Sequence, residues 1–384
     1  MKPIQLFKPK FEPEEVLGDI AEIMKSGWVG LGPKTEEFEN KFAAYVGARH
    51  AVAVNSCTAA LHLALKALNI TEGMKVATTP MTFISTNAVI LYEKANPVFI
   101  DVDKFTMNMS YDDLREQCGR TTIRAIMVVH YAGQPIDMEP FYALANEFNI
   151  PIIEDAAHAA GARYKNGKAV GSNPYHFGLT CFSFHAVKNL PMGDGGMITT
   201  NLSTVAERLR RLRWLGIDKS TFVRTKAGES NGYNWMYNVK ELGFKYHPND
   251  ITSIIGINQL EHLPAHNLHR RQIRRWYEKY ITSNRVKFVG LEEPDGSVSS
   301  CHIVAIKVPR SSRDGLIERL NREDIFPGVH YYPNHLYPIF EDYTRHMEVV
   351  EYEWERLISL PCHLELTKQD VQRISQAIMD FFGR

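Results

Sequence analysis

The stretch that decides the fold runs from Thr180 to Thr200 and reads TCFSFHAVKNLPMGDGGMITT. One apolar run ends near Ser183, and a second run leaves a glycine-rich turn and ends at Thr200. Short apolar runs bounded by glycine predict two buried strands. Lys188 lies between them, and a lone loop lysine is usually solvated. The surrounding sequence must therefore decide whether Lys188 is a catalytic amine or an ordinary loop lysine.

Similar apolar runs occur repeatedly before this stretch, and helical stretches such as 138–148 lie between many of them. The predicted strands cover 50–54, 75–79, 96–101, 124–130, 150–155, 180–184 and 195–200. This alternation indicates an α/β domain with a mostly parallel seven-stranded sheet that helices cover on both faces. Ligands of such sheets bind beyond the carboxyl ends of the strands. The segments at those ends are 55–58, 82–83, 155–158 and 183–188.

The chain of 384 residues is long for a single core, which favours two domains. From residue 286 the pattern changes to a strand, a helix, a loop and a last helix, which predicts a smaller α+β domain. We expect a large domain with an N-terminal arm over 1–260, a small domain over 261–384, and a long helix near the boundary. The polar stretch 218–242 is expected to be a functional loop.

The composition is that of an ordinary globular enzyme, with 44% hydrophobic and 23% charged residues. Lys+Arg and Asp+Glu both number 44, so net charge gives no reason to expect nucleic acid or an acidic membrane as a partner. The five cysteines form no C-x-x-C pair, which argues against a disulfide framework or a metal site. No apolar run approaches membrane-spanning length. We expect a cytoplasmic protein without a metal.

The side chains at the predicted strand ends offer four complementary kinds of group. Asp155 offers an acid, Phe83 a flat aromatic ring and Lys188 an amine. The fourth group is an anion cradle, formed by Ser56, Cys57, Thr58 and Ser183. Pyridoxal 5′-phosphate (PLP) presents a phosphate, a pyridinium nitrogen, a ring face and an aldehyde to match them. Helix capping by Ser56, Thr58 or Asp155 is the alternative interpretation.

Asp155 and Lys188 have definite tasks if PLP is the ligand. Asp155 would keep the pyridine nitrogen protonated, so that the ring withdraws electrons from the substrate carbon. Lys188 would hold the cofactor covalently and then serve as the base that moves the substrate proton. This requires a lysine that can be neutral, and burial lowers the pKa of a lysine.

The chain resembles the DegT/StrS family of PLP-dependent sugar aminotransferases over nearly its whole length. Seven segments in the right order carry the resemblance. They include GLGPKTEEFENKFAAYVGARHAVAVNSCTAALHLALKAL, IPIIEDAAHAAGARY, SFHAVKNLPMGDGGMITTN, GFKYHPNDITSIIGINQL and VHYYPNHLYPIF, with PMTF at 80–83 and SLPCH at 359–363. The resemblance implies a fold-type-I aminotransferase that forms a homodimer with active sites at the subunit boundary. It also implies L-glutamate as amino donor and a nucleotide-linked keto sugar as acceptor.

Residue roles follow from the resemblance by position. Lys188 is the covalent anchor, Asp155 the pyridinium partner, and His158 lies near the phenolic oxygen of PLP. The phosphate would be held by Thr58 and Ser183 with the cradle of Ser56 and Cys57, and Phe83 would stack on the ring. Lys245 stands where many members carry an asparagine that reaches the partner subunit's phosphate. The candidates for the sugar side are His185, His330 and His335; packing of a loop is the alternative role for the last two.

Two further hypotheses stay open from the sequence. The acceptor is either a nucleotide-linked sugar or a free keto sugar, a keto sugar acid or a cyclitol ketone. A regulatory or binding protein that kept the fold and lost the chemistry is the alternative of another class, and intact Lys188 and Asp155 argue against it. A dehydratase branch of the family has histidine at the lysine position. Lys188 therefore favours amine transfer over dehydration.

Overall fold

The centre of the computed structural model, which describes residues 2–173, 178–218, 236–290 and 296–383, is a seven-stranded sheet in the order β1-β7-β6-β5-β4-β2-β3. Strand β7 runs antiparallel to both of its neighbours, and the other six strands share one direction. This confirms the predicted mostly parallel sheet. The strands are β1 His50–Val54, β2 Lys75–Thr78, β3 Asn96–Phe99, β4 Ile123–Val129, β5 Ile152–Asp155, β6 Leu179–Ser183 and β7 Gly196–Thr200.

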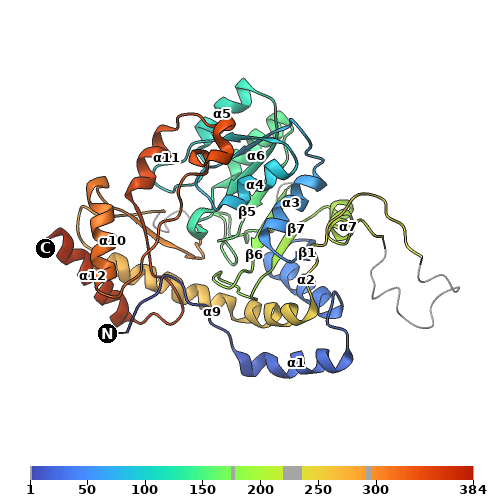
Figure 1. Ribbon diagram of the computed structural model, residues 1–384, viewed down its shortest axis with the longest axis horizontal. Coiled ribbons are helices and arrows are strands. Elements are labelled where there is room, and N and C mark those ends of the chain that lie inside the picture. Colours follow the sequence, from blue (N-terminus) through green and yellow to red (C-terminus); the bar gives the residue numbers. More distant parts are fainter. Residues whose placement is uncertain (1, 174–177, 219–235, 291–295, 384) are drawn as a thin grey trace.

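Helices cover both faces of this sheet (Figure 1). Successive side chains of a strand point to opposite faces, so Ala53 of β1 belongs to one apolar cluster and Val54 to the other. The first cluster includes residues of α2 Pro33–Val46, α5 Tyr111–Arg120, α6 Met138–Phe148 and α9 Asp250–Tyr280. The second includes residues of α3 Cys57–Ala67, α4 Ile84–Tyr92 and α7 Ser203–Leu212.

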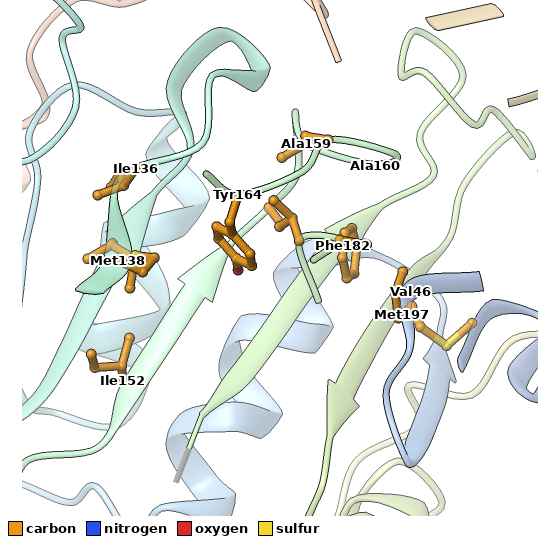
Figure 2. Packing of buried hydrophobic residues seen from close by; sticks show 14 of the residues in the cluster. Val46, Ile136, Met138, Ile152, Ala159, Ala160, Tyr164, Phe182 and Met197 are labelled. Carbon is orange, nitrogen blue, oxygen red and sulfur yellow. The ribbon is translucent and has the colours of Figure 1, made fainter. Parts of the chain in front are cut away.

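Large side chains fill the first of these clusters. Figure 2 shows Phe182 of β6 between Tyr164 and Met197, with Val46 of α2 beside Met197. Phe182 is fully buried and its ring lies 5.0 Å from that of Phe42, edge to face. This tight layer fixes the strand whose end leads to Lys188.

A second, smaller sheet has the order β10-β9-β8. Its strands are β8 Lys287–Phe288, β9 Val304–Lys307 and β10 Leu357–Leu360, and they form a core with α10 Arg313–Arg322 and α12 Lys368–Phe382. The predicted α+β unit is therefore present. Strand β10 was not predicted, because LISL is too short to show a period. The N-terminal arm joins this unit through a parallel bridge between Ile4 and Ile325. The short helix α11 Glu348–Glu353 comes shortly before β10 in the sequence.

The long helix α9 connects the two units. It has 31 residues, includes Pro264, and packs against α1 Pro13–Ser26, α2 and α12. The proposed domain boundary after residue 260 falls inside this helix, so the division into 1–260 and 261–384 stays a prediction. Of the loop expected over 218–242, residues 219–235 lie outside the described residues.

Three further features concern the cysteines, the helices and groups of side chains that could bind a metal. None of the five cysteines is part of a disulfide, and all five are buried. Among the described residues, no helix combines the length and apolar character that crossing a membrane requires. Within the same ranges, no group of three or more His, Cys, Asp or Glu side chains is placed to hold a metal ion.

Candidate active site

A cavity of about 580 Å³ lies at the carboxyl ends of the parallel strands. Its walls come from the segments that follow β1, β2, β5 and β6, from the segment 329–337, and from Phe7 and His302. Ten of the predicted site residues line it: Ser56, Cys57, Thr58, Phe83, Asp155, His158, Ser183, His185, Lys188 and His330.

The anion cradle is the N-terminus of α3. Ser56 is its N-cap and accepts a hydrogen bond from the Ala59 N–H at 3.1 Å, so Cys57 and Thr58 stand in the first turn. The Ser56 hydroxyl therefore serves as a cap, as the alternative interpretation held, while the helix still directs its free N–H groups at the cavity. Strand β7 approaches closely here: a Cβ on Gly196 would lie 2.5 Å from the Ser56 carbonyl oxygen and 2.8 Å from the Cys57 nitrogen. Glycine at this position keeps the cradle open.

Lys188 follows β6 and lines the cavity. Its side chain is half-buried, and removal of the amine from water lowers the pKa of Lys188 to about 8, although nearby Cys57 and Asp155 act in the opposite direction. At that pKa a substantial fraction of the amine is neutral near physiological pH. Lys188 thus meets the requirement for a lysine that binds an aldehyde and accepts a proton.

Asp155 ends β5 and is buried beneath the cavity. Its Oδ2 accepts a hydrogen bond from Thr86 Oγ1 at 2.7 Å, and its Oδ1 accepts one from the Ala157 N–H at 3.0 Å. Burial raises the pKa of Asp155, while these two hydrogen bonds and Lys188 work against the rise. A buried carboxylate of this kind is suited to pairing with a cation such as a pyridinium.

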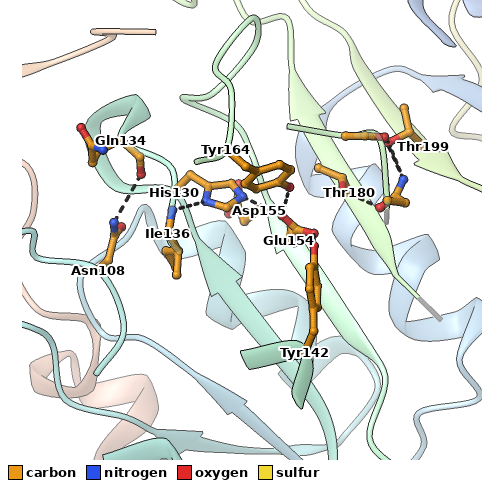
Figure 3. A network of polar contacts seen from close by, with 12 residues as sticks. Asn108, His130, Gln134, Ile136, Tyr142, Glu154, Asp155, Tyr164, Thr180 and Thr199 are labelled. Carbon is orange, nitrogen blue, oxygen red and sulfur yellow. Dashed lines mark hydrogen bonds and ion pairs between the residues drawn. The ribbon is translucent and has the colours of Figure 1, made fainter. Parts of the chain in front are cut away.

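The neighbouring acid Glu154 serves the core. It accepts hydrogen bonds from His130 Nε2 at 2.8 Å and Tyr142 Oη at 2.9 Å, and a further one from Tyr164 Oη. Figure 3 shows this network around Glu154. The choice between the two adjacent acids, which the sequence left ambiguous, is settled by the side of the strand that each one faces.

His158 lies between the cavity and the segment 329–337. Its Nε2 and Tyr331 Oη are 3.0 Å apart in a hydrogen bond, and its Nδ1 is buried without a partner among the described residues. Burial holds the pKa of His158 well below its usual range, so the ring is neutral. A buried nitrogen without a partner at a cavity wall indicates a group that a ligand would satisfy. Phe83 is 58% exposed and lines the same cavity.

Three more predicted residues, His185, His330 and Ser183, line the cavity. His185 is exposed at the cavity, and His330 lines it with Nδ1 2.8 Å from Ser359 Oγ. Burial lowers the pKa of His330 to about 4. Ser183 is buried at the end of β6, where its Oγ accepts from the His185 N–H at 3.4 Å.

Two predicted residues do not line the cavity of this chain. His335 is 1% exposed, its Nε2 lies 3.2 Å from Glu351 Oε1, and it packs beside Phe99, so it has the packing role that was its alternative. Lys245 places its Nζ 3.5 Å from the centroid of the Trp214 ring. The task expected for Lys245 concerns the partner subunit's phosphate and stays a prediction.

Several residues at or beside the cavity were missed from the sequence, among them Tyr331, Tyr332 and Tyr337. His302 Nε2 lies 3.5 Å from Lys188 Nζ, and Phe7 of the N-terminal arm stacks on the His302 ring at 5.3 Å. Thr86 supports Asp155 from helix α4. His302 starts an apolar run that looks like a core strand, and Phe7 lies in a proline-rich arm, so neither had a local signal.

These residues fit PLP. The open helix terminus suits a phosphate, the buried acid suits the pyridinium nitrogen, and the lysine of low pKa suits the aldehyde. His158, whose buried Nδ1 has no partner among the described residues, also lines the cavity.

Comparisons with known proteins agree with this geometry. Residues 11–379 match the model of the DegT/DnrJ/EryC1/StrS aminotransferase family. The spore coat polysaccharide biosynthesis protein SpsC of Bacillus subtilis is 35% identical over 380 residues, which cover 96% of this chain and 94% of SpsC.

Two solved structures show the same fold. The aminotransferase TlmJ from Streptoalloteichus hindustanus superposes with a TM-score of 0.90 at 28% identity, with 99% of each chain covered. The PLP form of the putative sugar aminotransferase Spr1654 from Streptococcus pneumoniae gives a TM-score of 0.88 at 26% identity, with 99% of this chain and 98% of that chain covered. The chain therefore belongs to the DegT/DnrJ/EryC1/StrS aminotransferase family and is a PLP-dependent aminotransferase of fold type I.

Proposed function

We propose that the protein transfers the amino group of L-glutamate to a keto sugar, carried on a nucleotide diphosphate, in the biosynthesis of an amino sugar. The observation that carries this proposal is the presence of Tyr331, Tyr332 and Tyr337 in the lining of the cavity, together with His185. Tyrosine offers an apolar ring face to the C–H groups of a sugar and a hydroxyl to its oxygen atoms. SpsC acts in polysaccharide biosynthesis by its name, and Spr1654 is a putative sugar aminotransferase, which favours the same substrate class.

In this proposal the residues around Lys188 have the roles that the family resemblance implies. Bound PLP supplies an electron-withdrawing ring next to the substrate carbon. Thr58 and Ser183, with the cradle of Ser56 and Cys57, would hold the phosphate; Asp155 would hold the proton on the ring nitrogen. Phe83 would cover the ring face, and His158 would donate to or accept from the phenolic oxygen.

Lys188 has the proton-moving role in this proposal. When its amine is free, Nζ would move a proton between carbon atoms: it would take the proton from one carbon and deliver it to the other within the same half of the reaction, so that the amine is free again for the next half. A base works best when its pKa lies near the working pH, and the pKa of Lys188 is about 8. Glutamate and the keto sugar would use the same base in turn.

We also propose that two chains pair to complete the site. Met236, Val239 and Leu242 are 59%, 54% and 82% exposed, which is a large apolar surface for one short segment. Lys245 follows this segment in the sequence. If a second chain covers the segment, Lys245 would lie close to that chain. Sedimentation of the purified protein tests this; a monomer at the concentrations used in activity assays would exclude a shared site.

A substrate panel tests the acceptor. The enzyme is loaded with PLP, treated with L-glutamate, freed of 2-oxoglutarate, and offered nucleotide-linked 3-keto and 4-keto sugars beside free ketoses, keto sugar acids and cyclitol ketones. The proposal predicts an aminated product from a nucleotide-linked sugar only. Amination of a free ketone with no preference for the nucleotide would replace the proposed acceptor, and release of no 2-oxoglutarate would exclude glutamate as donor.

A further inference from the structure

The basic nitrogen of His302 lies beside the reactive amine. His302 comes just before β9 of the smaller sheet, is 1% exposed, and places Nε2 3.5 Å from Lys188 Nζ. Phe7 packs flat against the ring, with 7° between the two planes. The imidazole is thus held by the arm and by the smaller sheet, 114 residues from the lysine that it faces.

A chain of amide groups determines which nitrogen of His302 carries its hydrogen. Asn189 Nδ2 donates to the Ser300 carbonyl oxygen at 2.9 Å and to Asn267 Oδ1 at 2.7 Å. A backbone carbonyl only accepts, so the amide nitrogen of Asn189 must face it, and Oδ1 of Asn189 must face His302.

The consequence for His302 is a fixed tautomer. Its Nδ1 lies 2.9 Å from Asn189 Oδ1, which only accepts, so Nδ1 carries the hydrogen. Asn267 is fixed in turn because its Nδ2 donates to the Ala160 carbonyl oxygen at 2.8 Å. In the neutral ring, Nε2 therefore presents its lone pair to Lys188 Nζ.

We propose that His302 is a positioning residue for Lys188, whose Nε2 accepts a hydrogen bond from Nζ whenever the lysine amine is free. The contact holds the amine at one place in the cavity between its acts of binding and proton transfer. Asn189 and Asn267 hold the imidazole in the accepting tautomer. No side chain other than the lysine is needed to carry the proton.

The surroundings agree with an acceptor rather than an acid. Burial holds the pKa of His302 well below its usual range, and Lys188 lowers it further, so the ring stays neutral. The other titratable groups around Lys188 are Cys57 from α3, Asp155 from β5, and His158 and His330. A neutral acceptor binds an ammonium group more strongly than an amine, so the contact favours protonated Lys188 and its loss lowers the lysine pKa.

Two substitutions separate positioning from simple packing. The side-chain nitrogen of His302→Asn can replace Nδ1–H opposite Asn189 but leaves no acceptor near Lys188. The longer side chain of His302→Gln can place an oxygen where Nε2 was. The cofactor-free protein is treated with a small acylating reagent over about pH 6 to 10, and modification of Lys188 is followed by peptide mass spectrometry.

The expected midpoint for modification is near pH 8 in the wild-type protein. It should fall by at least about half a pH unit in His302→Asn and stay near the wild-type value in His302→Gln. In the PLP-loaded enzyme, kcat should fall about 10- to 100-fold in His302→Asn with little change in KM for glutamate, and His302→Gln should recover most of it. An unchanged midpoint in His302→Asn, or equal losses in both variants, would overturn the proposal.

A measurement on the wild-type protein covers the case in which a variant does not fold. Nitrogen NMR of cofactor-free protein labelled in histidine should show His302 with hydrogen on Nδ1 and none on Nε2. Detection of the opposite tautomer, or of a doubly protonated ring at pH 7, would overturn the proposal without any substitution.

Discussion

Asp155 and Glu154 are consecutive residues of β5, yet their carboxylates lie on opposite faces of the sheet. Asp155 lines the cavity and bonds Thr86 of α4, whereas Glu154 bonds His130, Tyr142 and Tyr164 on the other side (Figure 3). The alternation of a strand thus gives one acid to the site and the other to the core.

Substitution of each acid by its amide should separate these two tasks. Asp155→Asn should keep the fold and lower kcat at least about 100-fold, because the ring nitrogen loses its anionic partner. Glu154→Gln should cost about 1–3 kcal/mol of unfolding free energy, because one of three buried donors loses its acceptor. Denaturant unfolding and single-turnover kinetics on both variants check this. The reverse pattern would mean that the pyridinium partner is assigned to the wrong acid.

Thr86 should lower the pKa of Asp155 through one hydrogen bond. Its hydroxyl donates to Asp155 and so receives the hydrogen of Thr82, which lies 2.8 Å away. Thr86→Val removes the donor, which should raise the pKa of Asp155 further and move the acid limb of the activity profile to higher pH. Thr86→Ser keeps the hydroxyl and is the matched control. Equal acid limbs in both variants would show that the bond does not act on Asp155.

Gly196 should be required for the phosphate cradle. The Cβ of Gly196→Ala would press on the Ser56 carbonyl and the Cys57 nitrogen, displacing the start of α3 at a cost of about 1–3 kcal/mol. We expect lower stability and at least about tenfold weaker binding of PLP, measured by equilibrium dialysis. Gly30→Ala is the control, because a Cβ there meets nothing within 4 Å. Normal PLP affinity in Gly196→Ala would show that the start of α3 does not bind the phosphate of PLP.

The attachment of PLP should depend on pH through Lys188. Only the neutral amine attacks an aldehyde, and the pKa of this lysine is about 8. The rate at which cofactor-free protein captures PLP should therefore rise with pH and level off above about pH 8. Stopped-flow absorbance measures this rate. A rise that continues towards pH 10, the range of an ordinary exposed lysine, would contradict the burial of the amine.

The sequence predicted much of this architecture because local patterns specify it. The apolar runs identified all seven strands of the main sheet, and the rule that ligands bind at strand ends brought Lys188 and Asp155 into one cavity. The small second unit was visible in the change of pattern after residue 286.

The remaining features depend on long-range packing that no local pattern records. His302 reaches Lys188 only because the smaller sheet and the N-terminal arm fold against the strand ends. His335 follows His330 by five residues, yet a 3₁₀ turn at 334–336 places it against Glu351 rather than in the cavity. The position of Lys245 relative to a second chain depends on how two chains pair, which local sequence patterns do not record.

The most direct test of the account is the fate of cofactor in Lys188→Ala. The wild-type protein should turn yellow with PLP, lose the visible band on addition of L-glutamate with release of 2-oxoglutarate, and retain cofactor on peptide 188 after borohydride reduction. Lys188→Ala should stay folded, bind PLP without a reducible covalent link, and complete no turnover. A variant that transaminates at the wild-type rate, or a wild-type protein that keeps no cofactor on Lys188, would contradict the account.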